Sequence, residues 1–586
     1  MNAAAAKSVG QKASSSPAAE PKKKPKSKYV VHAPTRETLE SIVVAFILAF
    51  LFRTFEAEPF VIPTGSMADT LNGRHKEVDC EQCGWHYHIG ASREVTGDSG
   101  IVDPHQRIRA SVCPNCRYAN DIFDAPVYQG DRIIVNKFPY EIGDPERWDV
   151  IVFKNPEEPM RNFIKRLVGL PNEYLRIDGG DVYARKDQKA EWKILRKDDP
   201  DKQFLLQMIV YDNDHPERNL IEHGWPERWA ATTPEDAFET DPAGWKQAAE
   251  SRSFVLEQAS ADPRWIRYRH FVPDEDDWNA IFQDPPLPFD GKPAPKLIND
   301  FCGYNEIVPG AFNAIPAYWV GDLTVHFDIE LREPGEQSEL TMVLTEGIRD
   351  YRCTIDLKSG DATLAYFDRA FDRDQKIATE TTSIRGAGAY SVSFANVDNR
   401  LCLWIDGELV PFKNEGDVNR GGEYDAPATT VPTKNDLAPV GISLLGTAAE
   451  ISHLKLERDI YYRPEQENWM KEERRLDRNR GFERQNDVHP RELLFALDEP
   501  ERYAKLYLKH EHWVEFPPLK DDEYFVMGDN SPASLDSRLW KHTHAVPRHD
   551  LLGKAFFIYW PHGVPFLNDG KGYPITYHQQ TGGGEK

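Results

Sequence analysis

Short runs of alternating apolar and polar side chains fill residues 315–463, and this pattern leaves few folds open to the chain. Such runs lie at 323–331, 351–357 and 400–410. Because successive side chains of a strand point to opposite faces of a sheet, the alternation predicts half-buried strands. Several strands at this spacing predict a β-sandwich. Strand patterns at 128–138 and 552–560 extend the prediction to a mainly β chain.

The chain has one strongly apolar segment, close to its amino terminus. The uninterrupted apolar part, residues 42–52, is shorter than the ~20 residues that usually span a bilayer. Glu40 and Arg53 at its ends would therefore have to reach the interface with their charged groups. Residues 1–35 are rich in Ala, Ser, Lys and Pro, and this composition predicts a disordered tail.

The charges on the two sides of this segment have opposite sign. Residues 1–36 hold seven lysines and one arginine against one glutamate, whereas the whole chain of 586 residues carries a net charge of −24. This asymmetry predicts a single-pass signal anchor at 36–57, with the tail in the cytoplasm, close to anionic membrane lipid, and the body outside. A buried helix of a soluble domain and a cleaved signal peptide are the alternatives. The acidic body argues against nucleic acid as a partner.

Two Cys-x-x-Cys pairs follow the apolar segment. They are formed by Cys80, Cys83, Cys113 and Cys116. Paired thiolates on two tight turns can supply four tetrahedral ligands, and such a closed shell is structural rather than catalytic. The pattern predicts a structural zinc ion, while disulfides or a redox pair are the alternative in an oxidising compartment. His86, His88 and His105 are interpreted as loop histidines rather than ligands.

A small polar turn directly after the apolar segment holds Ser66, the candidate nucleophile. Cleavage of a peptide bond also needs a base, and no His-Asp pair is evidently placed to serve this serine. Lys165 is the candidate base, because burial among apolar neighbours can lower the pKa of an amine by several units from about 10.4. A solvated turn serine and a surface lysine are the ordinary alternatives.

Three segments together resemble the signature boxes of bacterial type I signal peptidases, which are Ser/Lys proteases of the membrane surface. The boxes are Phe-Val-Ile-Pro-Thr-Gly-Ser-Met-Ala-Asp-Thr-Leu at 60–71, Asn-Phe-Ile-Lys-Arg-Leu-Val-Gly-Leu-Pro at 162–171 and Gly-Asp-Asn-Ser-Pro-Ala-Ser-Leu-Asp-Ser-Arg at 528–538. Their order and their place after the apolar segment also match. The resemblance implies a signal-peptidase-type β catalytic core with one transmembrane helix.

The resemblance implies a role for each matched residue, with Ser66 as nucleophile and Lys165 as general base. The supporting residues would be Thr64 in the oxyanion hole, Ser534 beside the lysine amine, and Asp536 with Arg538 as an ion pair. One position departs from the family, because Asp69 stands where a proline is usual, which frees a backbone N–H and loosens the turn. No cofactor is implied for catalysis.

The implied substrate is a preprotein with a signal peptide that ends in small residues at the first and third positions before the cut. The substrate would add as a strand to an exposed sheet edge. Phe60 and Ile62 lie on one face of an extended strand ahead of the nucleophile and are the candidate pocket residues. The implied location is the bacterial inner membrane, with the catalytic domain outside the cytoplasm.

The domain plan that follows has two insertions within a split core. It runs as a basic tail at 1–35, an anchor at 36–57, the first part of the core at 58–186 with a cysteine insert at 77–120, an unassigned insert at 187–314, a β-sandwich at 315–463, a helical return at 464–490, and the second part of the core with a tail at 491–586. The Asp406-Gly407 hairpin makes the sandwich similar in style to laminin-G or concanavalin-like jelly rolls.

Two other functions stay open at this point. A catalytically silent, membrane-anchored envelope protein could bind a glycan or a protein partner through the sandwich. A soluble self-cleaving repressor with the same Ser/Lys chemistry is disfavoured by the expected anchor and by the lack of a helix-turn-helix pattern. A silent protein would have no use for the four residues Ser66, Lys165, Thr64 and Ser534 together.

Overall fold

The structure is a computed structural model. It describes residues 38–47, 57–96, 101–197, 200–248, 251–287, 289, 293–306, 316–414, 421–427, 429–464, 488, 490–510 and 512–560. The chain divides into two units, residues 1–56 and 57–586, and residues 38–47 of the first are helical. The basic tail, both ends of the expected anchor and nearly all of the helical return lie outside the described residues.

In the part of the chain that the structure describes, no helix combines the length and the apolar character that a membrane crossing requires.

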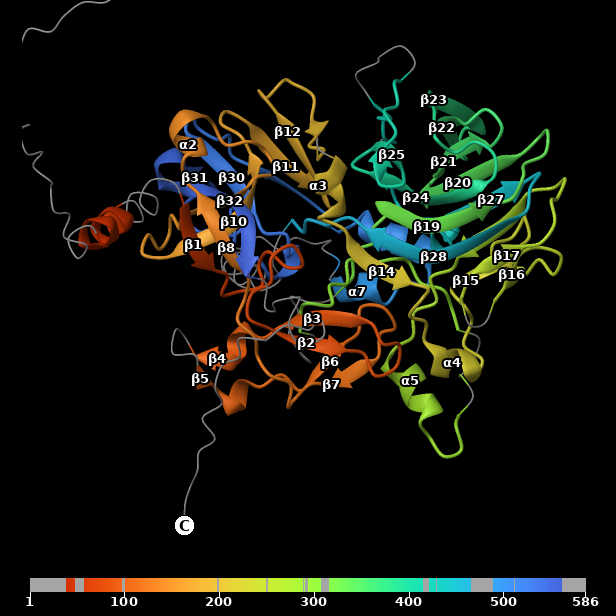
Figure 1. The fold of residues 1–586 in the computed structure, drawn as a ribbon, viewed down its shortest axis with the longest axis horizontal. Helices are drawn as coiled ribbons and strands as arrows, with labels where there is room; N and C mark the ends of the chain where they lie inside the picture. The colour runs from red at the N-terminus through yellow and green to blue at the C-terminus, as the bar shows by residue number, and fades with distance from the viewer. Residues whose placement is uncertain are drawn as a thin grey trace, which may run out of the picture. The chain divides into compact units, whose positions relative to one another are not determined.

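The prediction of a mainly β chain is confirmed (Figure 1). A seven-stranded antiparallel sheet, called the core sheet here, has the order β1-β8-β32-β9-β10-β30-β31. Its strands are β1 (Ala57–Val61), β8 (Arg132–Asn136), β9 (Val150–Lys154), β10 (Asn162–Gly169), β30 (Glu523–Met527), β31 (Val546–Pro547) and β32 (Leu551–Trp560). Strands from the two ends of the chain therefore pair directly, and everything between β10 and β30 is inserted into this sheet.

A second, separate sheet has four strands in the order β13-β12-β11-β29. Its strands are β11 (Tyr174–Asp178), β12 (Asp181–Arg185), β13 (Lys193–Ile194) and β29 (Trp513–Phe516). Apolar residues of both sheets share one buried cluster, which includes Val168, Leu175 and Phe525. Strand β10, which carries Lys165, is thus packed against the four-stranded sheet through Val168.

The alternating runs form the two sheets of a sandwich. One has the order β16-β17-β28-β19-β24-β25-β26, with β14 also paired to β28, and the other has the order β15-β18-β27-β20-β21-β22-β23. The strands from the alternating region are β19 (Leu323–Leu331), β20 (Glu339–Glu346), β21 (Arg349–Asp356), β22 (Asp361–Asp368), β23 (Arg373–Thr381), β24 (Gly388–Val397), β25 (Arg400–Ile405), β26 (Glu408–Leu409), β27 (Val440–Leu445) and β28 (Ala449–Arg458). Their inward side chains form the largest buried cluster.

The stretch that the sequence left unassigned contributes strands to both of these sheets. They are β14 (Met208–Asp212), β15 (Trp229–Thr232), β16 (Lys246–Gln247), β17 (Phe254–Leu256) and β18 (Arg264–Tyr268). These strands have two to five residues each, too few for a readable alternation, and three of them, β14, β17 and β18, pair with β27 or β28 far along the chain. The pairing therefore extends the sandwich back to residue 208.

The cysteine insert is built from three two-stranded hairpins. They are β2 (His75–Asp79) with β3 (His86–Gly90), β4 (Val95–Thr96) with β5 (Ile101–Val102), and β6 (Ala110–Val112) with β7 (Ala119–Asp121). The short helices are α2 (Pro139–Ile142), α3 (Pro200–Phe204), α4 (Arg218–Glu222), α5 (Glu275–Ile281), α7 (Pro490–Leu494) and α8 (Pro500–Tyr507). His86 and His88 lie in β3 and not in a loop, which corrects the sequence interpretation of these two residues.

Candidate active site

The turn that carries Ser66 follows β1 and is closed by its own backbone. Ala68 N–H donates to the Gly65 carbonyl at 3.1 Å, and Leu71 N–H donates to the Met67 carbonyl at 2.7 Å. Met67 and Leu71 are buried in one apolar cluster with inner residues of the core sheet, and this packing fixes the turn on the sheet. Ser66 is left 8% exposed.

Lys165 lies on β10 and reaches this serine. Its Nζ is 2.7 Å from Ser66 Oγ and donates to the Ile164 carbonyl at 2.8 Å. The lysine is only 3% exposed. The structure therefore brings together the two side chains on which the sequence interpretation depended.

Burial lowers the pKa of Lys165 to about 8. The carboxylates of Asp536 and Asp529 oppose this shift, and the Arg538 guanidinium reinforces it. Burial is the largest influence because an ammonium ion loses its hydration when it is surrounded by protein. An amine with this pKa is partly neutral near pH 7 to 8, so it can accept a proton from a serine hydroxyl.

The third box packs directly onto the turn. Asn530 N–H donates to the Ser66 carbonyl at 3.1 Å, and Asn530 Nδ2 donates to the Gly65 carbonyl at 2.9 Å. A Cβ on Gly528 would lie 2.3 Å from the Ser66 carbonyl oxygen and 2.2 Å from Ser534 Oγ. Only glycine permits this approach, which places Ser534 beside the backbone of Ser66.

Buried ion pairs hold the box in place. Arg538 contacts both carboxylate oxygens of Asp536 at 2.8 and 2.7 Å, and Asp536 also accepts from Gly528 N–H at 2.9 Å. Arg166, the residue after Lys165, makes a two-pronged contact with Asp529 at 2.7 and 2.6 Å. Bidentate arginine contacts fix the orientation of the paired groups as well as their distance. The contact of Arg166 with Asp529 therefore holds β10 and the 528–538 box in a fixed position relative to each other.

The structure places the remaining predicted residues around Ser66. Thr64 is exposed, and within the described residues its hydroxyl makes no hydrogen bond. Ile62 is buried at 2% exposure, and Phe60 is half-buried against the same apolar cluster, which also contains Ile164. Phe60 and Ile62 therefore do lie beside the β10 segment that carries the lysine.

Residues from the inserts also contact the turn, and no sequence signal pointed to them. The Tyr304 ring lies against Gly65, where an added Cβ would be 2.1 Å from its Cε1 atom. Asn305 and Asn530 exchange two side-chain hydrogen bonds of 2.7 and 2.8 Å. Asp69, at the position of the usual proline, interacts electrostatically with Arg458 of β28. Residues of the inserts thus help to hold the turn that carries Ser66 in place.

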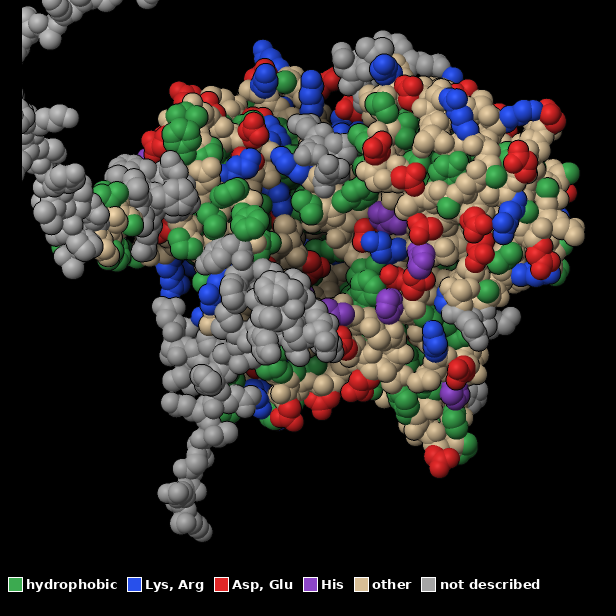
Figure 2. All heavy atoms as spheres, viewed as in Figure 1, with side chains coloured by type: hydrophobic (Ala, Val, Ile, Leu, Met, Phe, Trp, Pro, Cys, Tyr) green, Lys and Arg blue, Asp and Glu red, His purple; other side chains and the backbone are tan. Residues whose placement is uncertain are grey.

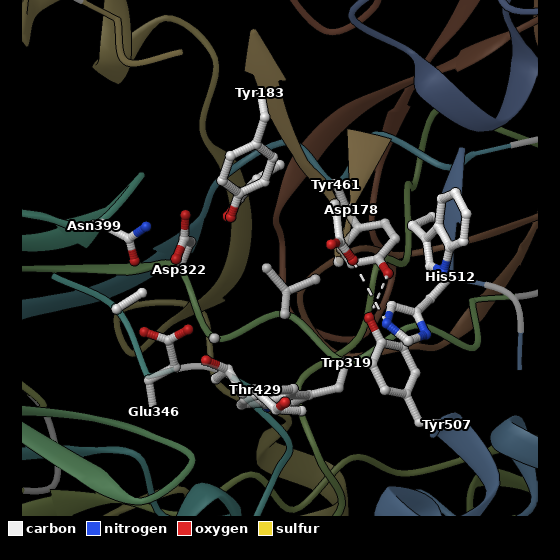
Figure 3. Close-up of a pocket in the computed structure, with 18 of the residues that line it drawn as sticks. Asp178, Tyr183, Trp319, Asp322, Glu346, Asn399, Thr429, Tyr461, Tyr507 and His512 are labelled. Carbon is white, nitrogen blue, oxygen red and sulfur yellow. Dashed lines mark hydrogen bonds and ion pairs between the residues drawn. The ribbon is translucent and has the colours of Figure 1, made fainter. Parts of the chain in front are cut away.

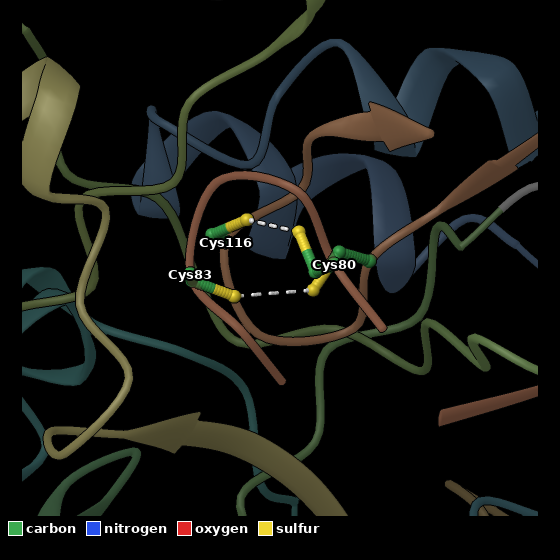
Figure 4. Close-up of side chains that lie close together, drawn as sticks. Cys80, Cys83 and Cys116 are labelled. Carbon is green, nitrogen blue, oxygen red and sulfur yellow. Dashed lines mark hydrogen bonds between the residues drawn. The ribbon is translucent and has the colours of Figure 1, made fainter. Parts of the chain in front are cut away.

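The four cysteines of the paired motifs converge on one point, as Figure 4 shows for Cys80, Cys83 and Cys116. The Sγ atoms of Cys80 and Cys116 are 3.5 Å apart, and those of Cys83 and Cys113 are 3.6 Å apart. A disulfide bond is about 2.05 Å long. A tetrahedron with Zn–S bonds of about 2.3 Å has edges of about 3.8 Å. The donor set therefore fits a four-thiolate metal site and not two closed disulfides.

The two cysteine turns have the same backbone pattern. Gly84 N–H donates to the Cys80 carbonyl at 2.9 Å, and Arg117 N–H donates to the Cys113 carbonyl at 3.0 Å. Gly84 and Arg117 both adopt a positive φ, 73° and 64°. Two matched turns that each present a pair of thiolates are the usual structure of a metal knuckle.

A separate hollow of about 340 Å³ lies between the four-stranded sheet and the sandwich (Figure 3). Asp322 and Glu346 line one side of it, and Asp178 lies across from them. Burial, together with neighbouring carboxylates, holds the pKa of Asp181 and of Asp322 well above the ordinary range. The junction therefore concentrates acidic groups that resist ionisation.

This cluster predicts a pH-dependent stability. A carboxyl whose pKa is raised by folding stabilises the fold below its unfolded pKa and loses that contribution as pH rises through the folded value. We therefore expect Asp322→Asn to raise the Tm at pH 7.5 by roughly 2 °C or more and to have little effect at pH 4. The control is Asp262→Asn, an exposed carboxyl in a turn, which should leave the Tm unchanged at both pH values. Equal Tm shifts at both pH values would contradict the electrostatic cause.

A protein-family model described as "Signal peptidase, peptidase S26" matches residues 108–275 and 466–560. These residues include Lys165 and the third box but not Ser66, whose connection to them is the 2.7 Å contact described above.

Curated relatives share parts of the chain. Signal peptidase I of Pseudomonas fluorescens is 48% identical over 59 residues, 8% of this chain and 21% of that protein. Signal peptidase I of Buchnera aphidicola is 25% identical over 32% of this chain and 49% of that protein. A probable signal peptidase I-2 of Synechocystis is 27% identical over 22% of this chain and 72% of that protein. The chain spans about a fifth of the length of the first relatives that it matches.

Solved structures align with the chain only at low TM-scores. The carbohydrate binding module CBM66 from Bacillus subtilis aligns with a TM-score of 0.22 and 11% identity, over 39% of this chain and 95% of that one. The galectin LEC-6 of Caenorhabditis elegans aligns with a TM-score of 0.16 and 9% identity, over 23% of this chain and 83% of that one.

Proposed function

We propose that the chain is a serine endopeptidase of the signal peptidase family, peptidase S26, whose model matches residues 108–275 and 466–560, and that it removes signal peptides from exported preproteins. The observation that carries this proposal is the buried amine of Lys165 at 2.7 Å from the Ser66 hydroxyl. A catalytically silent envelope protein, the main alternative, would gain nothing from burying a lysine with a lowered pKa against a serine.

In this proposal the neutral Lys165 amine takes the proton of Ser66 as its oxygen attacks the carbonyl carbon before the cut. The oxyanion that forms is stabilised by the Ser66 N–H, which donates no hydrogen bond within the described residues, and by the Thr64 hydroxyl. The lysine then returns the proton to the leaving amine. A water molecule, activated by the same amine, hydrolyses the acyl-enzyme and releases the signal peptide.

A substrate pocket limited by Ile62 and Phe60 would admit only small side chains. Both side chains pack in one apolar cluster with Ile164, one residue before the base. An extended peptide laid beside Ser66 would present alternate side chains to this wall, and large ones would not fit. The preference for small residues at the first and third positions before the cut follows from this arrangement.

The membrane is the proposed place of action, with residues 36–57 as the signal anchor. Exposed apolar side chains on the core sheet support this, because Phe556, Phe557 and Ile558 of β32 all face solvent. Ile142 of α2, which packs against β32, is also exposed. Figure 2 shows apolar side chains over the part of the surface that carries α2 and β32. A contiguous apolar surface of this kind is typical of a membrane contact.

Incubation of the detergent-purified full chain with a preprotein tests the proposed activity. We expect one cut after a small residue at the end of the signal peptide, identified by mass spectrometry, and no cut with Ser66→Ala. The matched control is Ser359→Ala, an exposed turn serine of the sandwich, which should cleave at the wild-type rate. Retained cleavage by Ser66→Ala at the same position would overturn the assignment of the nucleophile.

We further propose that the four clustered thiolates hold a structural zinc ion, which would tie the two cysteine turns together. Such an ion would contribute to folding of the insert and not to the reaction. We expect Cys113→Ser to lower the zinc content by one equivalent and to lower the Tm, whereas Cys402→Ser, a buried thiol of β25, should retain the zinc. Wild-type protein without zinc, with Cys80 or Cys113 oxidised, would decide for disulfides instead.

A further inference from the structure

One face of the β2–β3 hairpin gathers three side chains with metal-binding groups. His75 and Glu77 are two residues apart on β2, so they share a face, and Glu77 is paired directly with His88 on β3. One ligand atom from each of the three residues lies within 4.8 Å of the other two. The set is separate from the four thiolates, although β2 leads directly into Cys80.

The surroundings fix His75 in the form that binds metal. His75 has 0% exposure, and its Nδ1 lies 2.7 Å from the Gly73 carbonyl oxygen. A carbonyl can only accept, so Nδ1 carries the proton and the lone pair is on Nε2. Histidines that bind metals usually donate their other ring N–H to a carbonyl or carboxylate in this way.

The side chain of Asn72 can fix His88 in the same tautomer. The Nδ1 atom of His88 lies 3.3 Å from Nδ2 of Asn72, and Oδ1 of this buried amide has no hydrogen-bond partner among the described residues. Rotation of the amide by half a turn would let Oδ1 accept from the His88 Nδ1–H, which leaves Nε2 as the ligand atom. The hairpin face then presents two imidazole nitrogens and one carboxylate.

We propose that His75, Glu77 and His88 form a second metal site, for a divalent transition ion such as Zn²⁺. Two imidazoles and one carboxylate suit zinc and leave a fourth position for water or another ligand. The site lies next to the nucleophile turn, because Arg74 N–H donates to the Pro63 carbonyl and a Cβ on Gly73 would be 2.2 Å from the Thr64 carbonyl carbon. A bound ion would therefore anchor β2, the strand that follows the turn carrying Ser66.

The test is the metal content of the full chain after loading with Zn²⁺ and removal of free metal. We expect wild-type protein to hold one equivalent more than Glu77→Gln or His88→Gln. His86→Gln is the matched control, because His86 lies on the same face of β3 but is exposed and paired with Asp79 at 2.8 Å. It should retain the wild-type metal content.

Loading with Co²⁺ distinguishes the two sites by their spectra. Thiolate-to-cobalt bands in the near ultraviolet should be unchanged in His88→Gln, while the weaker visible bands of a nitrogen and oxygen site should disappear. Equal metal content in wild type and in both folded variants, or loss of thiolate bands alone, would overturn the second site. Ser66→Ala should hold the full metal content, so the result does not depend on the proposed protease activity.

Discussion

Replacement of Lys165 by methionine is expected to lower the rate of preprotein cleavage by about 10⁴-fold, the upper range for loss of a general base. Methionine fills a similar volume beside Ser66 but cannot accept its proton. The matched control is Lys154→Met on the neighbouring strand β9, where the lysine is exposed, and cleavage should be unchanged. A single-turnover assay of preprotein cleavage measures both variants. A loss smaller than tenfold in folded Lys165→Met protein would exclude the amine as the base.

The pKa of Lys165, lowered to about 8, should also set the pH profile of the proposed protease. Only the neutral amine is a base, and at pH 7 about one tenth of it is neutral. The value of kcat/KM should therefore rise about tenfold per pH unit up to pH 7 and level off above pH 8 to 9. A profile that is flat between pH 6 and 8 would contradict a lysine base.

Lys165 should also lower the free energy of unfolding of the chain near neutral pH. Its pKa is lower in the folded chain than the ~10.4 of the unfolded chain, so the unfolded state binds more protons between these values and stability rises with pH there. At pH 7 the buried amine therefore destabilises the fold, by up to about 3 kcal/mol for a shift of this size. Lys165→Met should unfold at a higher temperature than wild type at pH 7, with a smaller difference near pH 10.

How much the sequence could predict differs between the parts of the site. The boxes around Ser66 and Lys165 are short contiguous patterns, and the alternation in β19 or β21 is a local property, so both can be read without a structure. The contact of Asn305 with Asn530 joins residues 225 positions apart. Nothing in the composition around either asparagine indicates this contact. The same limitation hid β14, β17 and β18, whose partners β27 and β28 follow much later in the chain.

Asp69 shows how the inserts alter the site. The sequence predicts a looser turn there, because proline would restrict the backbone. The structure instead surrounds this turn with insert residues, and Thr70 Oγ1 donates to the Leu205 carbonyl at 3.4 Å. The carboxyl group of Asp69, whose pKa is raised by burial, also interacts electrostatically with Arg458 of the sandwich. We infer that rigidity which a proline would supply locally comes here from contacts with the inserted segments.

Gly65→Ala is the sharpest test of this support, and we expect it to lower cleavage by about 100-fold. The Tyr304 ring lies between two glycines, because an added Cβ would be 2.1 Å from it at Gly65 and 2.6 Å from it at Gly90. The ring is 3% exposed and cannot move aside, so the new methyl group must displace the backbone that carries Ser66. A displacement near 1 Å in an active site costs about 100-fold in rate.

The double variant Gly65→Ala/Tyr304→Ala should recover most of this loss, because removal of the ring makes room for the methyl group. Tyr304→Ala alone is expected to lower the Tm, since it leaves a cavity, but to retain more activity than Gly65→Ala. Gly143→Ala, where an added Cβ would meet its nearest atom at 3.5 Å, is the control and should cleave normally. If the double variant stays as inactive as Gly65→Ala while both remain folded, contact with Tyr304 is not what positions Ser66.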